Sequence, residues 1–298
     1  MPVAVIAAVN PADAVRVVLS TPDDKLSYQN AQYGYDKIVN PSVDVEKIES
    51  QLKLMTAEAW VVAGPNPSDI DKLKAVRQVI YDAGKWNDNI PFSYDHDDPF
   101  GLKVENKLLS TYLQTRRGNC VSMPVLHLIL AERLGLNVHL STAPLHMFIR
   151  YTNSTTGRSI NIEPTSGGYP ARDIWYRQKL PISDQAIERG LYLRTLTKRE
   201  SIAHMAATVV QYLMDTGQYR EAIRVSEAIL ENYPKDGFTF AKQASAAAMI
   251  LERDFERKYP PGTRMPPREQ VLFEHWHEIN RLSYNKARSL GWEPVDIK

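Results

Sequence analysis

The stretch that decides the fold is residues 117–135, which read RGNCVSMPVLHLILAERLG. A proline is tolerated only in the first turn of a helix, so Pro124 predicts a helix that begins at about 121–123. Residues 125–131 are apolar on almost every side, and such a helix belongs in the middle of a domain rather than on its surface. We therefore expect a buried helix with Cys120 at its N-terminal end.

The segment that follows this helix is expected to form an antiparallel meander. Residues 138–142 and 145–151 are rich in β-branched and apolar side chains, which is typical of strands. The sequence NSTTGR at 153–158 is turn material, and residues 159–162 return as a third strand. A buried helix followed by a meander indicates the α+β class.

Helical patterns flank this unit on both sides. The sequence GPNPS at 64–68 interrupts them and is the clearest domain boundary. We expect three domains, namely a helical N-terminal extension (1–66), the α+β core (67–182) and a helical C-terminal region (195–298). The helices expected around the core are 43–60, a helix that begins at Ser68 or Asp69, 199–215, 218–232 and 268–290.

The composition excludes several classes of protein. The 36 basic and 35 acidic residues give a formal charge of +1, so no nucleic-acid partner is expected. No run of 18 apolar residues is present, which excludes a membrane-spanning helix. The single cysteine cannot form an internal disulfide, and a cytoplasmic location is expected. A secreted or periplasmic location is the alternative if residues 1–9 are the remnant of a leader.

Cys120 is the first candidate for chemistry. The start of a helix presents unpaired N–H groups and the positive end of the helix dipole, which favour a thiolate. The same N–H groups can bind the oxyanion that forms when a thiolate attacks a carbonyl. The alternative interpretation is that Cys120 is a small buried hydrophobe.

A thiolate nucleophile needs a histidine and a third group that holds the imidazole. His146 begins the second expected strand. If the loop after that strand is 152–157, His146 falls opposite Glu163, within a slip of one or two residues. Asn161 lies on the same face as Glu163 and is the alternative orienting group. The alternative interpretation is that His146 and Glu163 form a polar pair that only stabilises the hairpin.

No metal or organic cofactor is expected. The sequence DHDD at 95–98 lacks the glycine and the distal glutamate of a calcium loop, so we interpret it as a solvated turn. His275 and His277 point to different faces of a helix and do not form a zinc site. His127 is expected to be a hydrogen-bonded histidine of the core. No phosphate-binding glycine loop and no dinucleotide motif is present.

Four motifs together resemble the transglutaminase-like core, and more narrowly its bacterial branch with a helical, tetratricopeptide-like tail. They are RGNC at 117–120, LGL at 134–136, PLHMFIR at 144–150 and NIEPT at 161–165. The resemblance implies a papain/transglutaminase-like fold, with a central helix against an antiparallel sheet. The family pattern, carried over by position, implies a triad of Cys120, His146 and Glu163. Active members typically have aspartate at the third position, so Glu163 is one methylene longer.

The C-terminal region carries one unit that resembles half of a tetratricopeptide repeat. Gly217, Tyr219, Ala222, Leu230 and Pro234 fall at the offsets of its second half. A stacked array needs about three repeats, so we expect no solenoid. Helices of this kind often present surfaces to protein partners.

The sequence thus predicts a thiol acyl-transfer or hydrolase enzyme that acts on a carboxamide of a protein or peptide. Cys120 would attack, His146 would transfer the proton, and Glu163 would orient His146. The backbone N–H of Cys120 would supply one oxyanion contact and Asn119 a second. The alternative is a catalytically inactive transglutaminase-like scaffold whose helical tail mediates protein–protein interaction.

Overall fold

Helix α6 (Ser122–Arg133) is the central helix of the part of the chain that carries the sheet, and neighbouring helices and strands pack against it. The structure is a computed structural model that describes residues 10–295, so the expectation for residues 1–9 lies outside the described part. Every residue of α6 from Ser122 to Ala131 is buried. Gly135 follows the helix with a φ of +73°, a conformation that glycine adopts without strain. The predicted buried helix is therefore confirmed, with its start and its end.

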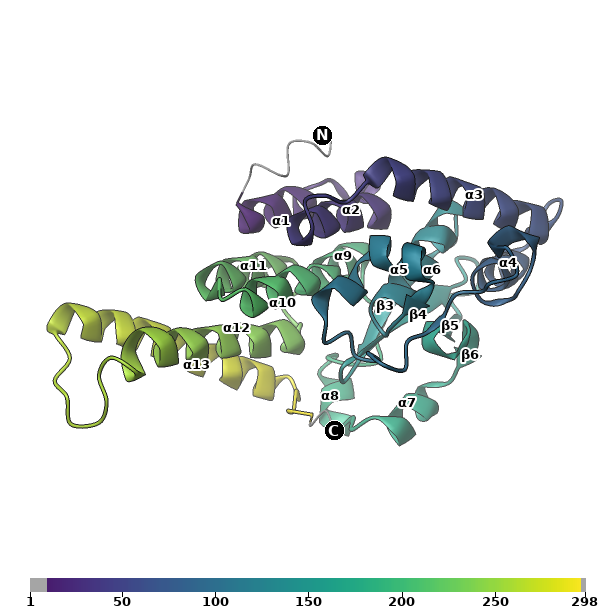
Figure 1. Cartoon of the computed structure of the whole chain (residues 1–298). Helices are drawn as coiled ribbons and strands as arrows, with labels where there is room; N and C mark the ends of the chain where they lie inside the picture. The colour runs from purple at the N-terminus through teal and green to yellow at the C-terminus, as the bar shows by residue number, and fades with distance from the viewer. Residues whose placement is uncertain (1–9, 296–298) are drawn as a thin grey trace. The chain divides into compact units, whose positions relative to one another are not determined.

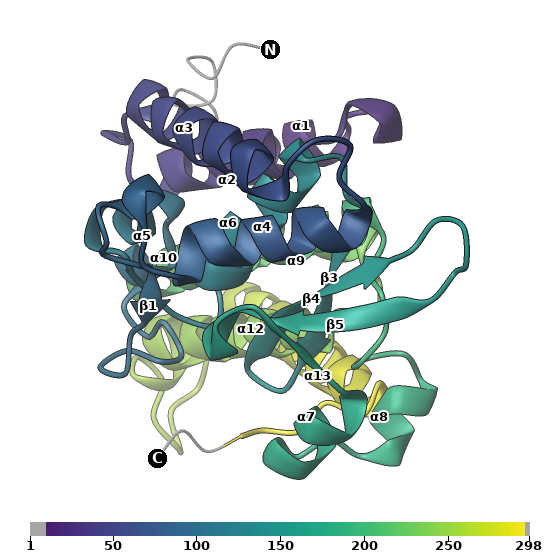
Figure 2. The same cartoon turned by 90° about the vertical axis from the view of Figure 1, so that its right-hand side faces the viewer.

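A four-stranded antiparallel sheet packs against one side of α6. Its strand order is β3-β4-β5-β6, and α6 contacts β3 and β4 directly (Figure 2). The meander expected from the sequence is confirmed, and β6 extends it by one short strand. The bounds of the strands are β3 Val138–Ala143, β4 His146–Thr152, β5 Ser159–Glu163 and β6 Tyr169–Ala171. The chain therefore has the α+β character that the sequence predicts.

Four helices cover α6 elsewhere, and two of them have a clear local reason to begin where they do. They are α2 (Tyr28–Val39), α3 (Val45–Ala63), α4 (Asp69–Tyr81) and α5 (Leu109–Thr115), and all four contact α6. Helix α4 begins with a capping box, in which Ser68 and Asp71 satisfy each other's backbone N–H groups. Asp44 caps α3, and Gly64 ends α3 with a φ of +79°. The helices predicted at 43–60 and from Ser68 or Asp69 are thus present, the first with both ends within three residues of the expected ones.

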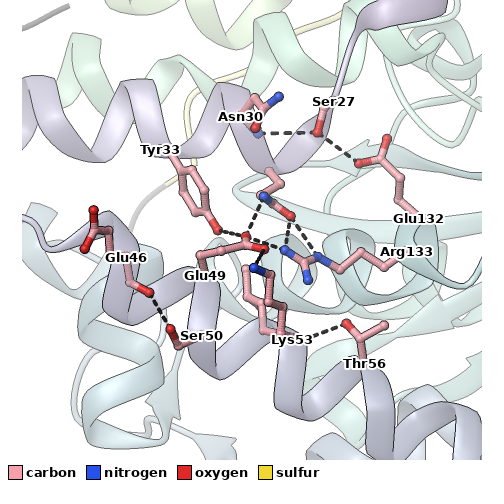
Figure 3. A network of polar contacts seen from close by, with 12 residues as sticks. Ser27, Asn30, Tyr33, Glu46, Glu49, Ser50, Lys53, Thr56, Glu132 and Arg133 are labelled. Atoms are coloured by element: carbon pink, nitrogen blue, oxygen red, sulfur yellow. Dashed lines mark hydrogen bonds and ion pairs between the residues drawn. The ribbon is translucent and has the colours of Figure 1, made fainter. Parts of the chain in front are cut away.

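A polar network fixes the C-terminal end of α6 to helices α2 and α3 (Figure 3). The guanidinium of Arg133 donates to the side chain of Gln29 and, at 2.5 Å, to Glu49. Glu49 also accepts a hydrogen bond of 2.9 Å from the hydroxyl of Tyr33. Beside it, the Ser27 hydroxyl lies 3.5 Å from Glu132. These contacts fix the C-terminal end of α6, and Cys120 lies at the opposite, N-terminal end.

The described chain divides into two compact units. The unit around the sheet comprises Pro22–Ile182 and Tyr192–Ser201, and we call it the sheet unit. Its remaining elements are short: 3-10 turns at Asp23–Lys25, Lys85–Asn87, Val104–Lys107 and Pro164–Ser166, a two-stranded parallel pair β1 (Ser93–Tyr94) and β2 (Arg117–Gly118), and α7 (Asp173–Lys179).

The second unit is helical, and we call it the helical unit. It comprises the described part of Met1–Thr21, Ser183–Leu191 and Ile202–Lys298. Its helices are α1 (Pro11–Leu19), α8 (Asp184–Glu188), α10 (Ala207–Asp215), α11 (Tyr219–Asn232), α12 (Gly237–Leu251), a π-helical turn (Glu252–Glu256) and α13 (Pro267–Ser289). Helices α12 and α13 form a long hairpin closed by a proline-rich loop (Figure 1). The helices predicted at 218–232 and 268–290 are confirmed within one residue.

Two features of the organisation differ from the sequence expectation. The helix expected at 199–215 is divided at Ala206 into α9 (Lys198–Met205) and α10, because the Ala206 N–H bonds to Ala203, three residues back. The segment 1–66, expected as one extension, is shared: α1 belongs to the helical unit, whereas α2 and α3 belong to the sheet unit.

Candidate active site

Cys120 lies between β2 and α6, two residues before the helix begins. Asn119 fixes this entry, because its side-chain oxygen accepts hydrogen bonds of 3.0 and 3.1 Å from the N–H groups of Val121 and Ser122. Gly118 must lack a side chain here, since a Cβ atom would come within 2.5 Å of the Tyr112 ring. The Cys120 side chain is therefore held at a defined position at the N-terminal end of α6.

His146 approaches Cys120 through a tight turn between β3 and β4. Ala143 pairs with His146, so only Pro144 and Leu145 form the turn. Leu145 has a φ of +54°, which costs energy in a residue with a Cβ atom. Its carbonyl accepts a hydrogen bond of 3.4 Å from the Cys120 thiol. The strained turn thus places the start of β4 against the sulfur.

The register of β4 and β5 differs by two residues from the expected one. Ile149 pairs with Ile162 and Arg150 with Asn161, which places Glu163 level with Phe148 rather than with His146. A shift of two residues in the register keeps the side chains of His146 and Glu163 on the same face of the sheet. The His146 Nε2 atom accordingly donates a hydrogen bond of 2.8 Å to Glu163 across the diagonal.

The carboxylate of Glu163 receives four hydrogen bonds in a buried position. Oε2 accepts from His146 and, at 2.9 Å, from the hydroxyl of Tyr176 on α7. Oε1 accepts from the N–H of Thr165 at 3.0 Å and from its hydroxyl at 2.6 Å. Tyr176 also stacks on Phe148, with 4.1 Å between the ring centroids. Sequence reasoning missed Tyr176, because no spacing rule relates α7 to the sheet.

These contacts favour the charged forms of both partners. Burial alone would lower the pKa of His146, but hydrogen bonds and negative charge from Cys120 and Glu163 outweigh it and raise the pKa to about 10. Burial would raise the pKa of Glu163, yet the hydrogen bonds from His146, Thr165 and Tyr176 hold it below its usual value. The imidazolium–carboxylate pair is therefore the stable state near neutral pH.

The two asparagines considered as supporting residues bind other groups. The side-chain oxygen of Asn119 accepts hydrogen bonds from the start of α6, and its side-chain nitrogen donates to the carbonyl of Asn106 at 3.0 Å. Asn161 accepts from Arg150 at 2.7 Å and donates to Asp173 at 2.6 Å. Glu163, not Asn161, is the residue that contacts His146.

The loop 95–103, between β1 and the 3-10 turn at Val104–Lys107, covers Cys120, whose exposed fraction is only 3%. The Cys120 N–H donates to the Pro99 carbonyl at 3.4 Å, and the Tyr94 hydroxyl donates to the same oxygen at 3.3 Å. On the outer side, the guanidinium of Arg117 pairs with Asp95 at 2.6 Å and with Asp97 at 2.7 Å. The loop is thus attached directly to the residues that flank the thiol.

Two expectations about polar residues need correction. The sequence 95–98 was expected to be a solvated turn, but Asp98 is buried and accepts hydrogen bonds from Leu102, Lys103 and Asn106. His127 is a core residue as expected, but neither ring nitrogen has a hydrogen-bond partner among the described residues. Burial, with a smaller contribution from Arg77, lowers its pKa to about 3.

A pocket of about 350 Å³ lies beside Glu163. Its lining comes from β6 and α7 and includes Tyr169, Ile174, Trp175 and Arg172. Three of these side chains are apolar or aromatic and partly exposed. Within residues 10–295, no group of three or more histidine, cysteine or acidic side chains is arranged to hold a metal ion. No helix in this range is long and apolar enough to cross a membrane.

Comparison with known proteins assigns the family. The family model of the transglutaminase-like superfamily matches residues 46–211, which is more than half of the 298 residues. Neither a search of curated proteins nor a search of solved structures returned a significant match. The matched segment contains the central helix, the antiparallel sheet and the cysteine, histidine and glutamate described above. The chain therefore belongs to the transglutaminase-like superfamily.

Proposed function

We propose that this protein is a thiol acyl-transfer enzyme that acts on a carboxamide of a protein or peptide through Cys120, His146 and Glu163. The observation that carries the proposal is the position of the His146 imidazole. Its Nε2 atom bonds to Glu163 at 2.8 Å, and the carbonyl of Leu145, the preceding residue, accepts a hydrogen bond of 3.4 Å from the Cys120 thiol. A nucleophile, a base and an orienting group close to one another are what cysteine catalysis requires.

The proposed reaction proceeds in two steps. The Cys120 sulfur attacks the carboxamide carbon, the carbonyl π electrons move to oxygen, and the C–N bond then breaks as His146 protonates the leaving amine or ammonia. Water or a second amine next attacks the thioester, His146 accepts its proton, and the sulfur leaves. The first acceptor gives hydrolysis and the second gives transamidation. Glu163 keeps the ring oriented throughout and stabilises its charged form.

The pocket beside Glu163 suggests where a substrate group would bind. Its apolar wall of Ile174, Trp175 and Tyr169 suits an uncharged side chain of the substrate. Because Glu163 is itself part of the lining, a group bound there would lie next to the triad.

A second candidate is the inactive scaffold, and the burial of Cys120 favours it. A thiol with an exposed fraction of 3% offers little access to a substrate. In the helical unit, Val271, Leu272 and Leu282 on α13 are exposed apolar side chains that could contact a protein partner. This candidate requires no reactivity at Cys120.

Alkylation by iodoacetamide at pH 6 distinguishes the two candidates. An ordinary thiol with a pKa near 8.5 is only about 0.3% thiolate at that pH. We expect the wild type to react at least tenfold faster than His146→Ala, and His275→Ala, which alters an exposed histidine of α13, to react like the wild type. Because Cys120 is the only cysteine, the mass of the intact protein reports its modification directly.

The comparison between variants removes the effect of the covering loop, since all three proteins carry it. Equal alkylation rates in the wild type and in His146→Ala would refute the enzymatic proposal and favour the scaffold.

A further inference from the structure

We propose that the hydroxyl of Tyr94 is the second donor of an oxyanion hole whose first donor is the Cys120 N–H. While the loop lies over Cys120, the Pro99 carbonyl occupies this hole. The inference rests on the proposed function and adds a catalytic residue to it. Asn119, the residue expected from the sequence, has both polar side-chain atoms engaged elsewhere.

The convergence of two donors on one oxygen carries the inference. The Cys120 N–H and the Tyr94 hydroxyl come from different segments, yet both donate to the carbonyl oxygen of Pro99, at 3.4 and 3.3 Å. One of these donors belongs to the nucleophile itself. An acyl group attached to the Cys120 sulfur would present its oxygen to that same N–H. The Pro99 oxygen therefore stands where a substrate oxygen would be bound.

The fold explains why Tyr94 is beside the nucleophile. Strands β1 and β2 are parallel, and Tyr94 pairs with Gly118, two residues before Cys120. The next residue, Asp95, donates its N–H to the Gly118 carbonyl at 2.6 Å. The backbone of Tyr94 is thus fixed by hydrogen bonds to the strand that leads into the catalytic helix.

The phenol of Tyr94 is suited to donate and not to ionise. Burial, together with the negative charges of Cys120 and Glu163, raises the pKa of Tyr94 to about 12. It therefore keeps its proton over the whole range in which His146 is cationic. A neutral donor that holds its proton can stabilise an oxyanion without a competing proton transfer.

The contacts of Pro99 are of a kind that a substrate can displace. The two hydrogen bonds, of 3.3 and 3.4 Å, are longer than the usual range for O–H···O and N–H···O bonds. On the outer side of the loop, Arg117 pairs with Asp95, whose side chain is 14% exposed, and with Asp97, whose side chain is 82% exposed. The exposed pair with Asp97 contributes little stability. The buried Asp98 fixes the base of the loop through its hydrogen bonds with Leu102, Lys103 and Asn106, so displacement of Pro99 is a local movement.

The step that Tyr94 would assist is the formation of the tetrahedral intermediate. The C–S bond forms, the C=O π pair moves to oxygen, and the resulting O⁻ accepts hydrogen bonds from the Cys120 N–H and the Tyr94 hydroxyl. When the intermediate collapses, the C=O bond is restored and the leaving group departs. Tyr94 stays protonated in both halves of the step.

Two small probes separate this role from a structural one. Acylation of Cys120 by p-nitrophenyl acetate passes through an oxyanion, whereas alkylation by iodoacetamide is a direct displacement that forms none. We expect Tyr94→Phe to slow acylation by at least tenfold, because removal of one oxyanion donor costs about 10²–10³ in rate in the best-studied case. Iodoacetamide alkylation should change by less than threefold. Rates are corrected by subtraction of Cys120→Ala.

The matched control is Tyr112→Phe. Tyr112 is a buried tyrosine of the same unit whose hydroxyl has no hydrogen-bond partner among the described residues, so both probes should react as in the wild type. If Tyr94→Phe slows both reactions in parallel, or neither, Tyr94 is not an oxyanion donor, while the proposed function still stands. If wild-type alkylation is independent of His146, the proposed function fails, and this inference fails with it.

Discussion

Tyr176→Phe tests whether the hydrogen bond from the Tyr176 hydroxyl stabilises the charged form of Glu163. The substitution removes the hydroxyl that donates to Glu163 Oε2 at 2.9 Å and leaves the ring stacked on Phe148. Thr165 and His146 continue to hydrogen-bond the carboxylate. The change therefore removes one of four donors and little else.

The magnitude follows from the charge of the acceptor. A hydrogen bond to a charged group contributes about 1.5–3 kcal/mol, so its loss should raise the pKa of Glu163 by about one to two units. The folded-state pKa of Glu163 is depressed, so its stabilising contribution is present above the pKa of the unfolded chain, near 4.3, and is lost as the pH falls. We expect Tyr176→Phe to lower the free energy of unfolding by about 2 kcal/mol at pH 7.

The assay must report on the sheet unit by itself. Hydrogen exchange in urea, measured by mass spectrometry on peptides from β4 and β5, gives the free energy of unfolding of those strands. At pH 3, below the pKa of the carboxyl in the unfolded chain, the effect of Tyr176→Phe should be smaller than at pH 7. Tyr112→Phe, which removes a hydroxyl without a partner, should show no such pH dependence. An equal loss at pH 7 and pH 3 would refute the interpretation that Tyr176 stabilises a charged Glu163.

Two further predictions concern the packing of α6. Because burial lowers the pKa of His127 to about 3, the folded state resists its protonation, and stability should fall as the pH drops below about 6.5, by up to about 1.4 kcal/mol per pH unit. His127→Leu should remove this loss in acid denaturation curves, and an unchanged curve would contradict it. Arg133→Met should lower the free energy of unfolding by about 1–3 kcal/mol in urea, since it removes the contacts to Gln29 and Glu49. The exposed Arg158→Met is its control, and an equal effect would refute the role of the network.

The sequence was most informative where physical rules are local. Pro124 and Gly135 bound the central helix because a proline fits only a first turn and a glycine accommodates the C-terminal φ. Ser68 is the N-cap of α4 for a similarly local reason. The β-branched runs and the turn at 153–158 placed the strands of the meander. Each of these features depends on a few neighbouring residues.

Features that depend on contacts between distant segments could not be obtained in this way. The register of β4 and β5 is set by packing and differs by two residues from the estimate made from loop length. The partners of Glu163 include Tyr176, which joins from α7. The covering loop, with Pro99 against Cys120, depends on the pairing of β1 with β2. No pattern within a single segment encodes these contacts.

The register also gives a physical reason for a glutamate at position 163. Glu163 lies level with Phe148, so its carboxylate must reach His146 along the diagonal between strands. Diagonal neighbours on one face are about 7–8 Å apart, against about 5 Å for directly opposed residues. The extra methylene of glutamate, relative to aspartate, covers part of that difference, and the carboxylate still accepts both hydrogen bonds from Thr165. The departure from the aspartate typical of active members is therefore compatible with a hydrogen-bonded pair, because strand register and side-chain length compensate each other.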